Sequence, residues 1–85
     1  MTTVVLPSLL AAQAGGQKRF DVQAGTLGEA LRALPVADLL FDEHGELRRL
    51  VNVYVDGIDA RADGGVTRPL AGGEPVLVLQ AVAGG

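Results

Sequence analysis

The stretch TLGEALRAL, residues 26–34, carries the signals of one short helix. Thr26 followed three residues later by Glu29 is the capping-box pattern, in which each side chain accepts a hydrogen bond from the backbone N–H of the other residue. Leucine and alanine then recur at helical spacing along one face, and Pro35 stops or kinks the run. The apolar stretch VADLLF (36–41) is predicted to add another helical turn that extends this cover.

Two strand-like stretches precede the helix. Residues Thr3 to Leu10 are rich in β-branched residues and leucine, and AGGQ (14–17) follows as a turn. The stretch KRFDVQA (18–24) then alternates apolar and polar side chains, as a half-buried strand does. We therefore predict a hairpin before the helix.

The chain after the helix contains two further strand-like stretches. VNVYV (51–55) alternates cleanly, and Asp56-Gly57 is a strong tight-turn signal. The segment 58–74 is punctuated by glycines, so it predicts a short strand and turns. PVLVLQAV (75–82) is the last strand, with Pro75 at its first position, where proline is tolerated.

This order of elements predicts an α+β fold, in which one main helix packs on one face of a mixed sheet of four to five strands. At this chain length the β-grasp is the expected form, covering residues 1–80 and followed by a flexible C-terminal Gly-Gly tail at 81–85. The predicted core consists of Val4, Leu6, Phe20, Val22, Leu27, Leu31, Leu34, Val51, Val53, Val76 and Val78.

Composition excludes several classes of function. The chain has 85 residues, a formal net charge of −3, no cysteine, and only one tyrosine and two phenylalanines. Nucleic-acid binding needs a basic surface with stacking aromatic side chains, so we expect none. No apolar run approaches the roughly 20 residues of a membrane span. The absence of cysteine excludes disulfides and points to a cytoplasmic location.

An apolar patch is predicted on the sheet face away from the helix. If Val76 and Val78 face the helix, Leu77 and Leu79 must point the other way, because side chains alternate along a strand. Tyr54 joins them by the same alternation. Exposed apolar patches often mark binding sites, so we interpret the three as a partner-docking patch. A sheet buried on both faces, or a dimer, would give the same pattern.

The remaining polar clusters do not suggest an active site. His44 has no partner at the spacing of a metal site or a catalytic triad, and Asp42, Glu43 and Glu46 are best explained as a solvated loop. Arg48-Arg49 precedes a strand and is interpreted as surface. We therefore predict no catalytic residue, no bound metal and no bound cofactor: the chain is not expected to be an enzyme.

Three stretches together, TLGEALRAL, RRLVNVYVDGIDAR and the final AVAGG, resemble the bacterial ubiquitin-like sulfur carriers of the MoaD/ThiS family. GGQKRF (15–20) is most similar to the CysO branch, which serves cysteine biosynthesis. The sequence departs from the common pattern at Gln80, where many carriers have proline.

The resemblance implies that the carboxylate of Gly85 is adenylated and converted to a thiocarboxylate, with Gly84, Ala83 and Val82 threading into the partner enzyme. Gly-Gly pairs also occur at 15–16, 64–65 and 72–73, so only the terminal position is informative. A terminal carboxyl is ionised near neutral pH. The stretch from Gln80 to Gly85 spans at most roughly 20 Å, and glycines fit a narrow channel.

The partners implied by the resemblance are enzymes. They are an ATP-using adenylyltransferase/sulfurtransferase of the ubiquitin-activating type (MoeB/MoeZ-like), a cysteine synthase that accepts the sulfur, and a zinc-dependent peptidase that releases the product. Alternatives are the small subunit of molybdopterin synthase, acting with the large subunit, or sulfur supply to thiamine or a thio-natural product. Two other classes are a ubiquitin-like protein modifier and a binding module with an inert tail.

Overall fold

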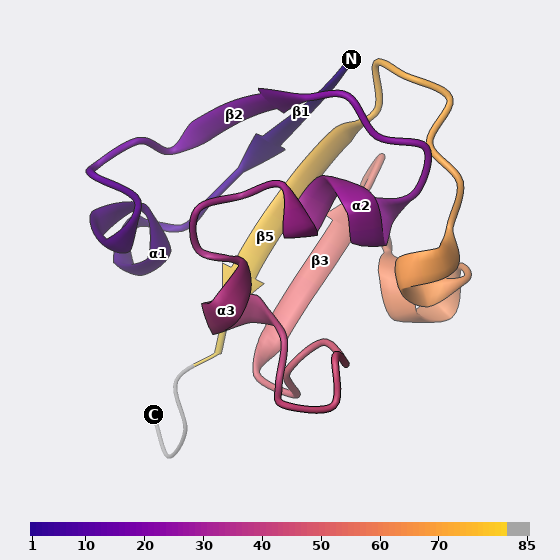
Figure 1. Cartoon of the computed structure of the whole chain (residues 1–85). Coiled ribbons are helices and arrows are strands. Elements are labelled where there is room, and N and C mark those ends of the chain that lie inside the picture. The colour runs from indigo at the N-terminus through magenta and orange to yellow at the C-terminus, as the bar shows by residue number, and fades with distance from the viewer. Residues whose placement is uncertain (82–85) are drawn as a thin grey trace.

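The computed structural model describes residues 1–81, and the fold is a single mixed sheet with short helices on one side. The strands are β1 (Thr2–Val5), β2 (Arg19–Val22), β3 (Val51–Val55), β4 (Ile58–Asp59) and β5 (Pro75–Gln80). The helices are α1 (Ser8–Gln13), α2 (Leu27–Arg32) and α3 (Ala37–Leu40), with two 3-10 turns, η1 (Ala60–Ala62) and η2 (Gly65–Thr67). Figure 1 shows their arrangement.

β5 lies in the middle of the sheet, whose strand order is β2-β1-β5-β3-β4. It pairs in parallel with β1 and antiparallel with β3. The predicted hairpin is present, because β1 and β2 pair antiparallel. β5 therefore pairs with β1 over residues 75–77 and with β3 over residues 76–80, and the pairing of Gln80 with Val51 fixes where the strand ends.

Helix α2 begins as the sequence predicts. The Thr26 hydroxyl oxygen accepts a hydrogen bond from the Glu29 backbone N–H at 3.3 Å, and the Glu29 carboxylate accepts one from the Thr26 N–H at 3.2 Å. Both halves of the capping box are thus formed. The additional helical turn predicted in 36–41 is α3.

The core lies between the sheet and the helices. The predicted members on β1, α2, β3 and β5 are buried there, as are Leu6 and Leu34, which follow β1 and α2. Phe20 and Val22 are only half-buried, because β2 is an edge strand. Nine further residues complete the core: Leu10, Ala11, Ala30, Val36, Leu40, Phe41, Val55, Ala60 and Leu70.

The strand predicted for Thr3 to Leu10 is wrong beyond Val5, where the chain turns into α1. Pro7 is the residue before the helix, with φ −70° and extended ψ. Its ring fixes φ and leaves no N–H for a sheet ladder, so the strand cannot continue through it. Leu10 and Ala11 are consecutive and both buried, which is helical rather than strand spacing.

The tight turn predicted at Asp56-Gly57 joins β3 to β4. Both residues have positive φ, 52° for Asp56 and 79° for Gly57. Two successive positive φ values characterise the type I′ turn, which suits the right-handed twist of a two-stranded hairpin. The turn therefore produces the short strand expected in this glycine-rich region.

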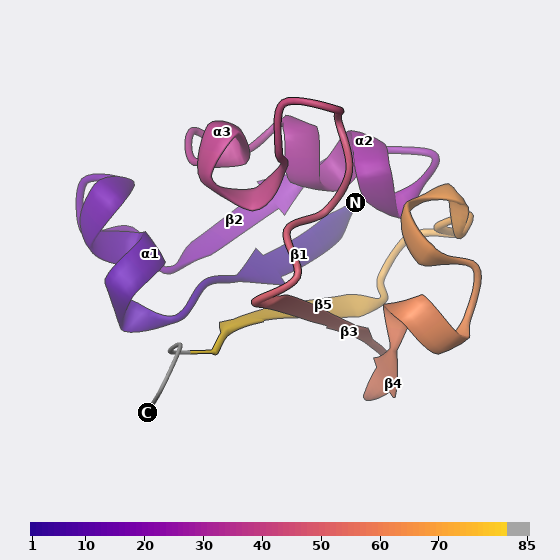
Figure 2. The same cartoon turned by 90° about the horizontal axis from the view of Figure 1, so that it is seen from below.

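Seen from below, α2 and α3 lie on the same side of the sheet, as Figure 2 shows. No helix of the part of the chain that the structure describes covers the other side. Within residues 1–81 no helix is long and apolar enough to cross a membrane. The uncovered side is called the open face below.

Candidate functional site

The open face carries the apolar side chains that the alternation predicts. Leu77 and Leu79 of β5 are each 41% exposed, and Tyr54 of β3 is half-buried. Leu77 lies opposite Tyr54 on one side and Val5 on the other. These four residues, Val5, Tyr54, Leu77 and Leu79, are called the open-face patch.

The patch exists because β5 is apolar on both of its faces. Val76 and Val78 are buried against the helices, and each alternates with one of the exposed leucines. Asn52, opposite Leu79, is a polar neighbour of the patch. An apolar surface at the centre of a sheet is costly to leave in water, and contact with another protein removes it.

The chain leaves the sheet next to Leu50. After β5 ends at Gln80, the Ala81 backbone N–H donates a hydrogen bond of 2.7 Å to the Leu50 carbonyl oxygen. Val82, Ala83, Gly84 and Gly85 lie outside the described residues, so their roles stay predictions, as does the boundary between 80 and 81.

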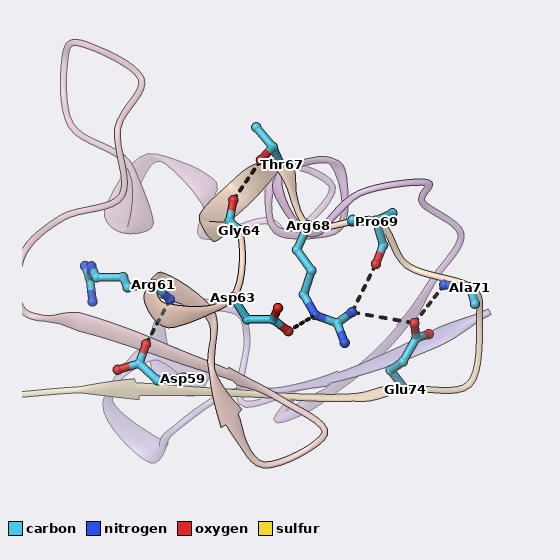
Figure 3. Close-up of polar contacts among 9 residues, drawn as sticks. All are labelled: Asp59, Arg61, Asp63, Gly64, Thr67, Arg68, Pro69, Ala71 and Glu74. Atoms are coloured by element: carbon cyan, nitrogen blue, oxygen red, sulfur yellow. Dashed lines mark hydrogen bonds and ion pairs between the residues drawn. The ribbon is translucent and has the colours of Figure 1, made fainter.

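The opposite end of β5 is held by a charged cluster that the sequence analysis missed. The Arg68 guanidinium lies between Asp63 and Glu74, with Nε 3.0 Å from Asp63 Oδ2 and Nη1 3.7 Å from Glu74 Oε2. Nη1 also donates to the Pro69 carbonyl oxygen at 3.0 Å, as Figure 3 shows. These contacts hold together the loop that leads into β5. The acidic and basic residues are scattered through the glycine-rich segment, so no pattern in the sequence pairs them.

Glu74 also caps the turn before β5. Its two carboxylate oxygens accept hydrogen bonds of 2.7 Å from the backbone N–H groups of Ala71 and Gly72. The bond from the Ala71 N–H is the main cause that holds the pKa of Glu74 below its usual value, and the Arg68 charge contributes in the same direction.

Arg61 is a second polar residue whose role the sequence does not reveal. Its guanidinium donates to the Asn52 side-chain oxygen at 3.2 Å and to the Arg48 carbonyl oxygen at 2.8 Å. The bonds tie η1 to the beginning of β3. Arg61 therefore supports the strand that contributes Asn52 and Tyr54 to the open face.

The remaining polar candidates lie in an exposed loop, as predicted. His44 Nε2 is 3.7 Å from the Glu43 carboxylate, and both side chains are largely exposed. Asp42 Oδ1 accepts hydrogen bonds from the backbone N–H groups of Glu46 and His44, and the first of these is the main cause that lowers the pKa of Asp42. Among residues 1–81, no group of three acidic, histidine or cysteine side chains is placed to hold a metal ion.

The fold and the sequence both match known sulfur carriers. The chain is 38% identical to the sulfur carrier protein CysO of Mycobacterium tuberculosis over 90 aligned positions, which cover 98% of this chain and 97% of the relative. The chain belongs to the CysO family of sulfur carrier proteins. The same-named protein of Mycobacterium bovis matches to the same extent, while no family model matches the sequence.

Solved structures agree with this family and with a ubiquitin-like β-grasp fold. The crystal structure of M. tuberculosis CysO superposes with a TM-score of 0.85 at 34% identity, covering 96% of this chain and all of that one. A BexX/CysO complex from Amycolatopsis orientalis gives 0.84 at 29% identity, covering both chains completely. The small archaeal modifier protein SAMP1 from Haloferax volcanii gives 0.77 at 30% identity, covering 99% of this chain and 98% of that chain.

Proposed function

We propose that the Gly85 carboxylate is adenylated and then converted to a thiocarboxylate that donates its sulfur to cysteine biosynthesis. The observation that carries the proposal is the match, along almost the whole chain, to curated sulfur carrier proteins. The chain has no cysteine, so no thiol side chain is present to hold the sulfur. A carboxylate becomes a sulfur donor when one oxygen is exchanged for sulfur, and the resemblance to sulfur carriers assigns this role to the terminal carboxylate of Gly85 and not to the ten side-chain carboxylates.

The chemistry proceeds in two steps on an activating enzyme. The ionised carboxylate attacks the α-phosphate of ATP, pyrophosphate leaves, and an acyl adenylate forms. A sulfide sulfur then attacks the carbonyl carbon and AMP leaves, which produces the thiocarboxylate. ATP is thus a substrate of the partner, an adenylating enzyme of the ubiquitin-activating type.

The open-face patch supplies affinity that the tail alone lacks. Ordering the tail costs about 1–2 kcal/mol per residue in backbone entropy, and more for glycine. Burying Leu77, Leu79 and Tyr54 against the activating enzyme offsets this cost, because each side chain still has apolar surface to remove from water. A likeness to a carrier solved in a BexX/CysO complex supports docking to a partner protein.

The sulfur acceptor is proposed to be a cysteine synthase that uses an activated serine derivative. The new cysteine would remain attached to Gly85 until a zinc-dependent peptidase releases it. Supply of sulfur to molybdopterin synthase through its large subunit is the alternative acceptor. Retention of a purified cysteine synthase by the thiocarboxylated chain, together with cysteine formation, would support the first; turnover only with the molybdopterin synthase subunit would support the second.

The test of the carrier function is intact-mass spectrometry after incubation with the activating enzyme, ATP and a sulfide source. The wild-type chain should gain the mass that corresponds to replacement of one oxygen atom by sulfur. Chains with Gly84→Ala, or with one residue added after Gly85, should not, because a Cβ or an extra residue misplaces the reacting carboxylate.

Matched controls keep the result interpretable. Gly45→Asn changes a glycine in the exposed 42–46 loop whose φ of 76° asparagine tolerates better than alanine does. It should leave thiocarboxylation intact, with circular dichroism confirming that every variant is folded. A thiocarboxylate formed on the extended chain would contradict the assignment to Gly85.

A role as a protein modifier is the second candidate, favoured by the likeness to a small archaeal modifier protein. Conjugation would use the same acyl adenylate with a lysine amine as the attacking group. Isopeptide-linked conjugates in cell lysate would favour this candidate. After tryptic digestion they are found by peptide mass spectrometry as lysines that carry the long C-terminal remnant of this chain, because no lysine or cleavable arginine lies between Pro69 and Gly85. A thiocarboxylate without any such remnant would favour the carrier.

A further inference from the structure

A second apolar surface surrounds the point where β5 ends. Three leucines from three separate segments are exposed there: Leu9 of α1 at 66%, Leu39 of α3 at 37%, and Leu50 before β3 at 43%. Figure 1 shows that α1, α3 and the end of β5 share this end of the molecule. Leu9, Leu39, Leu50, Arg48 and Arg49 are called the tail-end face below.

Two adjoining grooves run across the tail-end face. One, of about 540 Å³, is lined by Leu9, Leu10, Gln13, Leu39, Arg48 and Gln80. The other, of about 330 Å³, is lined by Asp42, Arg48, Arg49, Leu50, Val51 and Gln80. Arg48 and Gln80 line both, so the two grooves meet beside the last residue of β5.

The tail-end face is distinct from the open-face patch. Leu39 belongs to α3, which lies on the helix-bearing side of the sheet (Figure 2). Leu77 and Leu79 alternate along β5 with the buried Val76 and Val78, so they face the opposite side. The chain therefore leaves the domain between two apolar surfaces. The proposed function uses only the open-face one.

The charge of the tail-end face is opposite to that of the whole chain. Within residues 1–81, the guanidinium groups of Arg48 and Arg49 make no hydrogen bond or ion pair. The bonds of Arg48 are all made by its backbone, whose N–H donates to Leu40 and whose carbonyl oxygen accepts from Val51 and Arg61. The one carboxylate of the grooves, Asp42, already accepts two backbone N–H groups. Asp42 lies close enough to Arg48 for their charges to interact, but two guanidinium groups against one carboxylate leave the grooves with a net positive charge on a chain with net charge −3.

The tail is so short that an enzyme acting on Gly85 must come close to the tail-end face. Gly85 lies four residues beyond Ala81, so its carboxylate is within roughly 14 Å of Ala81 even when the chain is fully extended. Ala81 itself is hydrogen-bonded to Leu50. An enzyme that holds the Gly85 carboxylate in its active site must therefore bring the surface around that site close to the tail-end face.

We propose that the tail-end face docks the enzyme that adenylates Gly85, through an apolar segment of that enzyme flanked by carboxylates. This inference rests on the proposed function. The exposed leucines require apolar partners, and the arginines require acidic ones, with which guanidinium groups form paired, charge-assisted hydrogen bonds. Gln80, at the meeting point of the grooves, lies at the centre of the contact.

The test measures pyrophosphate release by a purified ubiquitin-activating-type adenylating enzyme at varied carrier concentrations. Leu9→Ser and Arg48→Glu should each raise the KM for the carrier, by about tenfold when combined, with kcat nearly unchanged, because they weaken docking but not chemistry. Ile58→Ser on β4 is the matched control, because Ile58 is an apolar side chain of the same size as leucine and is 52% exposed. This variant should leave KM unchanged.

A salt series provides a second readout that misfolding does not imitate. The KM of the wild-type chain should rise with ionic strength, because exposed charge pairs are screened. Replacing both arginines by glutamine should flatten this dependence, while Leu9→Ser should keep it. Urea unfolding of each variant confirms that the domain is intact.

The outcomes separate the inference from the proposed function. If the wild-type chain is not adenylated at all, the proposed function fails. If the wild-type chain is adenylated and the combined variant has an unchanged KM, the inference is overturned and the proposed function stands. A defect that appears only with the sulfur-accepting enzyme would also overturn the assignment to the adenylating enzyme.

Discussion

Leu79 is the residue at which the docking hypothesis is most directly tested. It is exposed, lies on the central strand and directly precedes Gln80, the last residue of the sheet. Leu79→Asp should weaken binding to the adenylating enzyme by about tenfold or more, which is about 1.4 kcal/mol, because a carboxylate would be desolvated at the interface. Isothermal titration calorimetry measures the change.

The control for this residue is Ile58→Asp, which places the same charge at an exposed apolar position on the far edge strand. Its affinity should equal that of the wild-type chain. Equal affinities for Leu79→Asp and wild type would count against the open-face patch while leaving the chemistry at Gly85 untouched.

The positions of some single side chains could be predicted from the sequence, and those of others could not. Leu77 and Leu79 were placed on the open face by strand alternation alone, and the structure confirms their exposure. Arg61 and Arg68 could not be placed, because their partners are fixed by how turns fold in three dimensions and not by spacing. Local periodicity reports which face a side chain occupies, but not which distant group it meets.

At the scale of elements, the loop that enters β5 should make stability depend on pH. The N–H groups of Ala71 and Gly72 favour the ionised form of Glu74, so the pKa of Glu74 is lower in the folded than in the unfolded chain. Its contribution to the free energy of unfolding is therefore present above the unfolded value of 4.5. The contribution is lost as pH falls through the lowered pKa.

Urea unfolding of the wild-type chain and Glu74→Gln between neutral and acidic pH checks this expectation. The wild-type chain should be the more stable near pH 7, and the difference should shrink as the pH drops below 4.5. A difference that stays constant with pH would show that Glu74 acts through packing instead of charge.

Helix α1 was not predicted from the sequence, and the reason for the error lies in the local composition. β-branched and leucine-rich residues suit a strand, so the run to Leu10 resembles one. Pro7 is the contrary signal, because proline has no N–H to donate to a sheet. The capping box of α2 was recognised because its two partners are only three residues apart. The missed helix contributes Leu9 to the tail-end face, so the error also concealed that surface.

At the scale of the whole molecule, the fold was predictable because the order of strong patterns leaves few ways to bury them. Apart from the stretch that forms α1, the helix, turn and strand signals were confirmed in sequence order, and the sheet has the predicted mixed pairing. The tail-end face was not predictable, since it is assembled from α1, α3 and the residues before β3, which come together only in the folded domain.

Removal of residues 82–85 should leave folding unchanged and abolish adenylation. All described core residues lie between Val4 and Val78, and the sheet ladder ends at Gln80. The truncated chain should therefore have the same urea midpoint as the full chain, since it buries the same apolar surface. A lower midpoint would show that the removed residues contact their own domain.

The parallel pairing of β1 with β5 places the two ends of the domain at opposite poles. Met1 lies beside Gly73, whose N–H donates to the Met1 carbonyl oxygen, while the chain leaves β5 at the other pole (Figure 1). A purification tag, dye or sensor-chip linker fused ahead of Met1 therefore stands clear of both apolar surfaces at the exit. The same label fused behind Gly85 would block the group that the proposed chemistry needs.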